Sequence, residues 1–148
     1  MRTTSDLTYA SLSASEAALS GILIGGLAGI PMAVYMAAAV LLGGFIFYPG
    51  MAVSTFVLMH IAVSSVYGLL YSLIFNFLSG SFKKTPSVGA AILGALIYAS
   101  VLLSLAVLVL LPSARSAQFE IPMAHIAIAH GIYAIFLSLL IHYTRFKQ

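Results

Sequence analysis

The sequence contains no cysteine, and its charged residues are few. The absence of cysteine excludes disulfide bonds, iron–sulfur clusters and metal sites built from thiolates. Charged residues make up 6% of the 148-residue chain, and none lies in residues 17–82, 85–114 or 121–144. No carboxylate therefore lies inside a long apolar stretch, which removes the usual intramembrane acid of proton- or sodium-coupled transport.

The common catalytic motifs are also absent. There is no glycine-rich phosphate loop ending in Lys-Ser or Lys-Thr, no His-Glu-x-x-His metalloprotease pattern and no Gly-x-Ser-x-Gly nucleophile turn. The net charge of +3 comes from basic residues at the ends of the apolar stretches, which is not the pattern of a nucleic-acid-binding surface. We expect no enzymatic activity, no catalytic residue and no nucleic-acid partner.

What the chain has in abundance is apolar sequence: 62% of its residues are hydrophobic, and the mean hydropathy is +1.14. A helix that spans a bilayer needs about 20 mostly apolar residues. We predict an all-α polytopic membrane protein with a single domain, 1–148, and four transmembrane helices at about 20–47, 51–78, 88–111 and 122–143. Ser13 and Glu16 have capping-box spacing, which predicts that the first helix starts there.

Basic residues indicate the orientation. With four spans, one side of the membrane holds Arg2, Lys83, Lys84, Arg145 and Lys147, whereas the other holds only Arg115. Lysine and arginine are enriched on the cytoplasmic side of membrane proteins. We therefore predict that both termini are cytoplasmic, in a prokaryotic plasma (inner) membrane.

The two halves of the chain, about 17–80 and 85–145, resemble one another. A shift of 63 residues places Tyr35 on Tyr98, and a shift of 65 residues places His60 and the two residues after it on His125 and the two after it. Each half holds two spans, so the pattern predicts two tandem helical hairpins related by a parallel internal repeat. Chance matching in so restricted an alphabet is the alternative explanation.

Small residues form a row along the first span, at Gly21, Gly25, Gly29 and Ala33. This four-residue spacing lets two helix backbones approach closely in lipid. The row predicts a helix-packing face. Its partner is another helix of the same chain, a second copy or a different subunit, and the sequence leaves the three open.

A polar stripe lies along the second span. On an ideal helix, Ser64, Tyr67 and Tyr71 fall within about 40° of His60. Such side chains face protein or water, because an unpaired polar group in hydrocarbon costs several kcal/mol. The stripe is consistent with mutual satisfaction inside the bundle, with a ligand site, or with a water-filled or proton-conducting path.

The ligand alternative is most concrete for a b-type haem. It needs two neutral imidazoles from different helices at similar depth, each fixed by an outer hydrogen-bond acceptor. Depth pairs His60 with His130, whereas the repeat pairs His60 with His125. His125 and His130 point about 140° apart on their helix, so they do not serve one site together.

The expected function is that of a small accessory or scaffold subunit in a larger membrane complex, of a respiratory or other energy-transducing kind. Its expected partners are the lipid bilayer and other membrane subunits or further copies of the chain. Two alternatives remain: a haem-binding membrane cytochrome, and a channel or carrier for a small neutral solute lined by the stripe from His60 to Tyr71.

Overall fold

Four long helices make up most of the described structure. The computed structural model describes residues 12–43, 52–81, 87–105, 108 and 122–145. The helices are α1 (Ala14–Gly43), α2 (Val53–Ser81), α3 (Val88–Leu105) and α5 (Met123–Arg145). Each is long and apolar enough to cross a membrane. The predicted all-α fold with four membrane-length helices is confirmed, and these helices indicate an integral membrane protein.

The start of α1 follows from its capping box. The Ser13 amide donates to the Glu16 carboxylate at 2.9 Å, and the Glu16 amide donates to the Ser13 hydroxyl at 3.3 Å. These bonds satisfy amides that have no partner within the first turn of a helix. The helix therefore begins at Ala14, six residues before the predicted span, and it continues through Pro31.

The other boundaries agree with the sequence to within three residues wherever both ends are described. α2 covers 53–81 against the predicted 51–78, and α5 covers 123–145 against 122–143. The predicted C-terminal ends of the first and third spans, at about residues 47 and 111, and the loop with Lys83 and Lys84 lie outside the described residues. The cytoplasmic location of the termini consequently stays a prediction.

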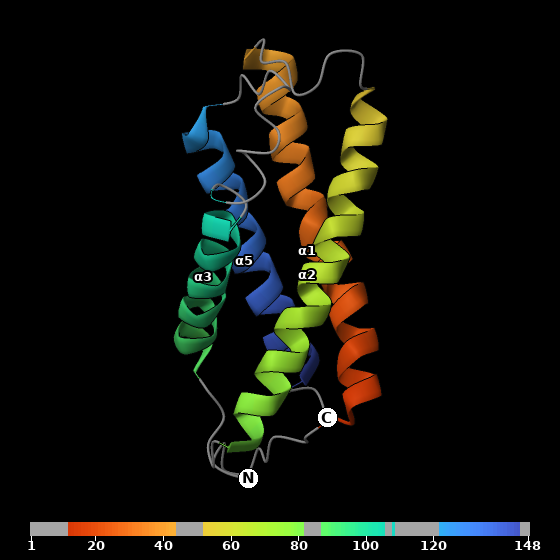
Figure 1. The fold of residues 1–148 in the computed structure, drawn as a ribbon, viewed down its shortest axis with the longest axis vertical. Helices are drawn as coiled ribbons and strands as arrows, with labels where there is room; N and C mark the ends of the chain where they lie inside the picture. The colour runs from red at the N-terminus through yellow and green to blue at the C-terminus, as the bar shows by residue number, and fades with distance from the viewer. Residues whose placement is uncertain (1–11, 44–51, 82–86, 106–107, 109–121, 146–148) are drawn as a thin grey trace, which may run out of the picture.

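The helices alternate in direction. α1 and α3 run one way, and α2 and α5 run the other way (Figure 1). α1 packs closely on both α2 and α5, and α3 packs on α5. In Figure 1, α5 lies between α3 and the crossed pair of α1 and α2. α2 and α5 therefore run in the same direction, as do α1 and α3. The internal repeat itself stays a prediction.

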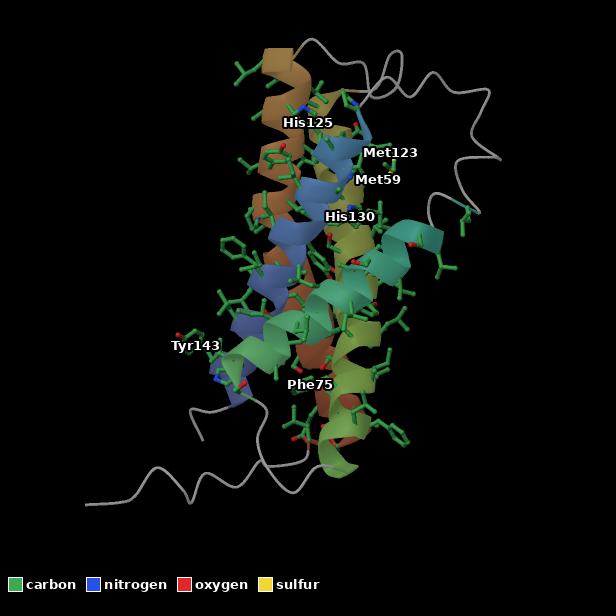
Figure 2. The ribbon with its side chains drawn as sticks, turned by 90° about the vertical axis from the view of Figure 1, so that its left-hand side faces the viewer. Met59, Phe75, Met123, His125, His130 and Tyr143 are labelled. Carbon is green, nitrogen blue, oxygen red and sulfur yellow. The ribbon has the colours of Figure 1, made fainter. Side chains whose placement is uncertain are left out.

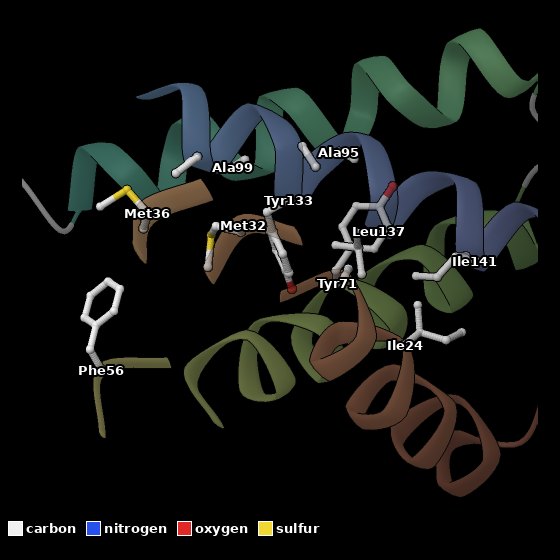
Figure 3. Close-up of a cluster of buried hydrophobic side chains, with 13 residues drawn as sticks. Ile24, Met32, Met36, Phe56, Tyr71, Ala95, Ala99, Tyr133, Leu137 and Ile141 are labelled. Carbon is white, nitrogen blue, oxygen red and sulfur yellow. The ribbon is translucent and has the colours of Figure 1, made fainter. Parts of the chain in front are cut away.

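The core is formed by one side of each helix (Figure 3). The buried residues of α3 are small, Ala91, Ala95 and Ala99, and Tyr98 of the same helix packs against the cluster, whereas the side chain of Tyr133 projects from α5 into its middle. The outer wall is apolar and exposed, as at Leu23 and Phe77. A surface of this kind faces acyl chains when the helices cross a bilayer.

Candidate functional site

The glycine face of α1 lies against α2 of the same chain. A Cβ atom added at Gly21 would lie 2.6 Å from the Ser72 Cβ atom, and one added at Gly25 would lie 2.5 Å from the Ser64 carbonyl oxygen. At Gly29 it would lie 2.5 Å from the Ser64 Cβ atom. Ala33 continues the row and is fully buried. The two backbones thus approach so closely that only glycine fits at three successive turns of α1.

The matching row on α2 consists of Ser64, Gly68 and Ser72. A Cβ atom on Gly68 would collide with the Gly21 carbonyl oxygen and the Gly25 Cα atom. The Ser72 hydroxyl donates to the Ala17 carbonyl oxygen at 2.7 Å, so the contact also contains a hydrogen bond between the helices. We did not single out Gly68 or Ser72 from the sequence, although the four-residue spacing of this row is the signal that could have found them.

Ser64 is the residue at which three helices meet. Its carbonyl oxygen accepts a hydrogen bond from the Tyr133 hydroxyl of α5 at 2.9 Å. Its own hydroxyl is buried and has no conventional hydrogen-bond partner. The Cβ direction of Gly29 points at this oxygen, 2.6 Å from the position that a Cβ atom would take.

Tyrosine hydroxyls connect α2 with the two helices on its other side. Tyr71 donates to the Ala91 carbonyl oxygen at 3.3 Å, and Tyr98 donates to the Tyr67 carbonyl oxygen at 2.8 Å. The rings of Tyr71 and Tyr98 have centroids 5.2 Å apart. With Tyr133, three tyrosines therefore donate to backbone carbonyls of another helix, which can each accept a second hydrogen bond. The stripe on α2 contacts several neighbours and does not converge on one point.

The histidines separate into two groups. His60 and His130 each place Nδ1 against the carbonyl oxygen four residues earlier in the same helix, at 3.1 Å from Phe56 and 2.8 Å from Ile126 respectively. His125 instead forms a 2.8 Å hydrogen bond through Nδ1 with the hydroxyl of Tyr35 on α1. Figure 2 shows His125 above His130 on α5. The structure thus joins His125 to α1 and leaves His60 and His130 in equivalent local arrangements.

Among the residues that the structure describes, no group of three or more His, Cys, Asp or Glu side chains is placed to hold a metal ion. Comparisons of the chain with protein-family models, curated proteins and solved structures find no match. Function is therefore inferred from the geometry of this chain.

Proposed function

We propose that the chain is a small integral membrane scaffold subunit that packs against other proteins of a larger membrane complex, with both termini in the cytoplasm. The proposal rests on the finding that tyrosine hydroxyls inside the bundle are used for hydrogen bonds between its own helices. Tyr71, Tyr98 and Tyr133 each donate their hydroxyl to a carbonyl of a neighbouring helix. These groups hold the bundle together, and the surface that remains for interaction is an apolar wall.

The outer face of α3 supports a protein contact on that wall. α3 is the least buried of the four candidate spans. A shallow groove of about 440 Å³ runs along it, between apolar ridges and over the small side chains of Ser100 and Ser104, and is lined by Leu96, Ile97, Ser100, Val101, Ser104, Leu105 and Leu108. Both hydroxyls donate to carbonyls of α3 itself at 2.8 Å. Small residues on a lipid-exposed face favour close approach of a second helix.

The test is purification at native abundance in a mild detergent, through a tag on the C-terminus. We expect other membrane subunits to co-purify in fixed ratio with the chain. Ser100→Trp fills the groove and should release them, whereas Leu23→Trp, on the exposed face of α1, should retain them. A wild-type chain that always isolates as a lone monomer would contradict the proposal. A complex that contains only further copies of this chain would replace the larger complex with a homo-oligomer.

A further inference from the structure

We propose that α3 is the movable helix of the bundle, and that the hydroxyls of Tyr71 and Tyr98 form a latch that holds it against α2. When the latch opens, α3 swings away from α2 while it stays packed on α5, and the side of the bundle between α2 and α3 opens. This inference does not depend on the scaffold role, because it concerns the isolated chain in a bilayer.

The other three helices form a frame in which each helix is joined to both of the others. α1 packs closely on α2 and on α5. The hydroxyl of the buried Tyr133 donates to the Ser64 carbonyl oxygen at 2.9 Å, which joins α5 to α2 and closes the frame. No helix of the frame can therefore move alone without disturbing two contacts.

α3 is attached to this frame on one side. Among the described helices, its backbone packs closely only on α5. Its buried residues are Ala91, Ala95 and Ala99, which have no long side chain to interlock with a neighbour. Figure 2 shows that α3 crosses α5 obliquely, and α3 is the least buried of the four candidate spans. Few buried contacts are typical of the part of a structure that moves at the lowest cost.

The contact between α3 and α2 consists of a reciprocal pair of hydrogen bonds. Tyr98 of α3 donates to the Tyr67 carbonyl oxygen of α2 at 2.8 Å, and Tyr71 of α2 donates to the Ala91 carbonyl oxygen of α3 at 3.3 Å. The two tyrosine rings lie between the helices, with centroids 5.2 Å apart. Each helix thus supplies one donor and one acceptor, and the two bonds together are the latch.

The latch can open without leaving a backbone group unpaired. Its acceptors, Tyr67 and Ala91, lie inside α2 and α3, where a carbonyl oxygen also accepts from the amide four residues later. That helical bond remains when the tyrosine bond breaks, so opening avoids the high cost of an unsatisfied backbone group in hydrocarbon. Only the two hydroxyls lose a partner. They favour the closed form by the strength of two hydrogen bonds and no more.

The experiment measures the distance between α2 and α3 in bilayers by double electron–electron resonance. The native chain has no cysteine, so Leu70→Cys on α2 and Leu93→Cys on α3, both exposed, can carry the two spin labels. In Tyr71→Phe/Tyr98→Phe, a population at longer distance should grow. We expect the ratio of open to closed forms to rise about fivefold to tenfold, as for the loss of two interhelical hydrogen bonds of average strength in membranes. A distance distribution that the two substitutions leave unchanged overturns the proposal.

Tyr133→Phe is the matched control for the latch. It removes a hydroxyl bond of the same kind, but within the frame. The distance distribution between Leu70→Cys and Leu93→Cys should therefore stay as in the wild type. An equal lengthening in Tyr133→Phe would show that the latch hydroxyls have no special role in holding α3, and would contradict the proposal.

A second pair of labels separates the opening of α3 from a general loosening of the bundle. Leu23→Cys on α1 and Leu70→Cys on α2 are both exposed and report on the frame. Their distance distribution should be the same with and without the latch hydroxyls, and circular dichroism should show unchanged helix content. Broadening of this distribution in Tyr71→Phe/Tyr98→Phe would mean that the hydroxyls hold the whole bundle together, and would contradict a movable α3. Because no partner protein enters these measurements, they can fail while the scaffold proposal stands.

Discussion

The two sides of α2 are held to their neighbours in opposite ways. Toward α1, glycine and serine let the backbones touch, and Gly68 lies directly against Gly21 and Gly25. Toward α3 and α5, tyrosines span a wider gap and donate to single carbonyls. In lipid, where burial of apolar surface does not drive helices together, close backbone packing and interhelical hydrogen bonds are the two available means of association. One helix uses both.

This difference determines what each interface tolerates. The contact between α1 and α2 depends on glycines, which have no side-chain atoms between the two backbones. The addition of one methyl group at such a position therefore pushes the backbones apart. The contacts through tyrosine depend on single groups, so removal of one hydroxyl affects one bond. We therefore expect additions to be costly on the α1 side of α2 and deletions to be moderate on the other side.

The largest effect is expected for Gly68→Ala. The added methyl group would overlap the Gly25 Cα atom and the Gly21 carbonyl, which are backbone atoms that cannot rotate away. We expect a loss of about 3 kcal/mol in the free energy of unfolding, the upper part of the range for overpacking. Unfolding in mixed detergent micelles, followed by circular dichroism, measures it.

Gly131→Ala is the matched control for Gly68→Ala. A Cβ atom at Gly131 meets nothing within 4 Å. Its stability should be unchanged or higher by up to about 1 kcal/mol, because alanine favours a helix over glycine. Equal losses in both variants would show that the close contact between α1 and α2 is not the cause.

An intermediate effect is expected for Tyr133→Phe. The change keeps the buried ring and removes the 2.9 Å hydrogen bond to the Ser64 carbonyl. We expect a loss of about 1 kcal/mol, as for a typical intramolecular hydrogen bond. Tyr71→Phe should cost less, because its bond to the Ala91 carbonyl is longer, at 3.3 Å. The reverse order in the same unfolding assay would contradict the assigned roles of these hydroxyls.

A smaller effect is expected for Ser72→Ala. It removes the only polar atom of a fully buried side chain and the hydrogen bond to the Ala17 carbonyl, while the tight backbone contact remains. We expect a loss of about 0.6 kcal/mol, the average for interhelical hydrogen bonds in membranes. Ser100→Ala removes a bond within α3 on an exposed face and should change stability by less than about 0.5 kcal/mol. If Ser72→Ala and Ser100→Ala lose the same unfolding free energy, the hydrogen bond from Ser72 to the Ala17 carbonyl does not stabilise the bundle.

Sequence reasoning located the helices because long uncharged stretches and the Ser13–Glu16 capping box are local signals. It also identified the row from Gly21 to Ala33, because a four-residue spacing is visible within one helix. It did not identify Gly68. This single glycine lies within the polar stripe of α2, and only the histidine, serine and tyrosines of that stripe were considered. Tyr98 and Tyr133 were likewise not predicted as hydrogen-bond donors.

Pairings between helices were the part that sequence could not decide. The bond between Tyr35 and His125 joins residues 90 positions apart, and nothing in either local pattern indicates the other. The same limit left His60 with two candidate partners.

The most direct test of the account is a disulfide between α1 and α2 in Gly29→Cys/Ser64→Cys. The native chain has no cysteine, and an ideal Cβ atom at Gly29 lies 2.5 Å from that of Ser64, so a small separation of the helices brings the pair into disulfide range. Mild oxidation in membranes should give a product of monomer size, in which the α1 and α2 fragments stay linked after proteolysis between them. A mixture of the two single-cysteine variants should give no linked dimer. A product linked only between chains would show that the glycine face of α1 meets another molecule and would contradict the fold described for this chain.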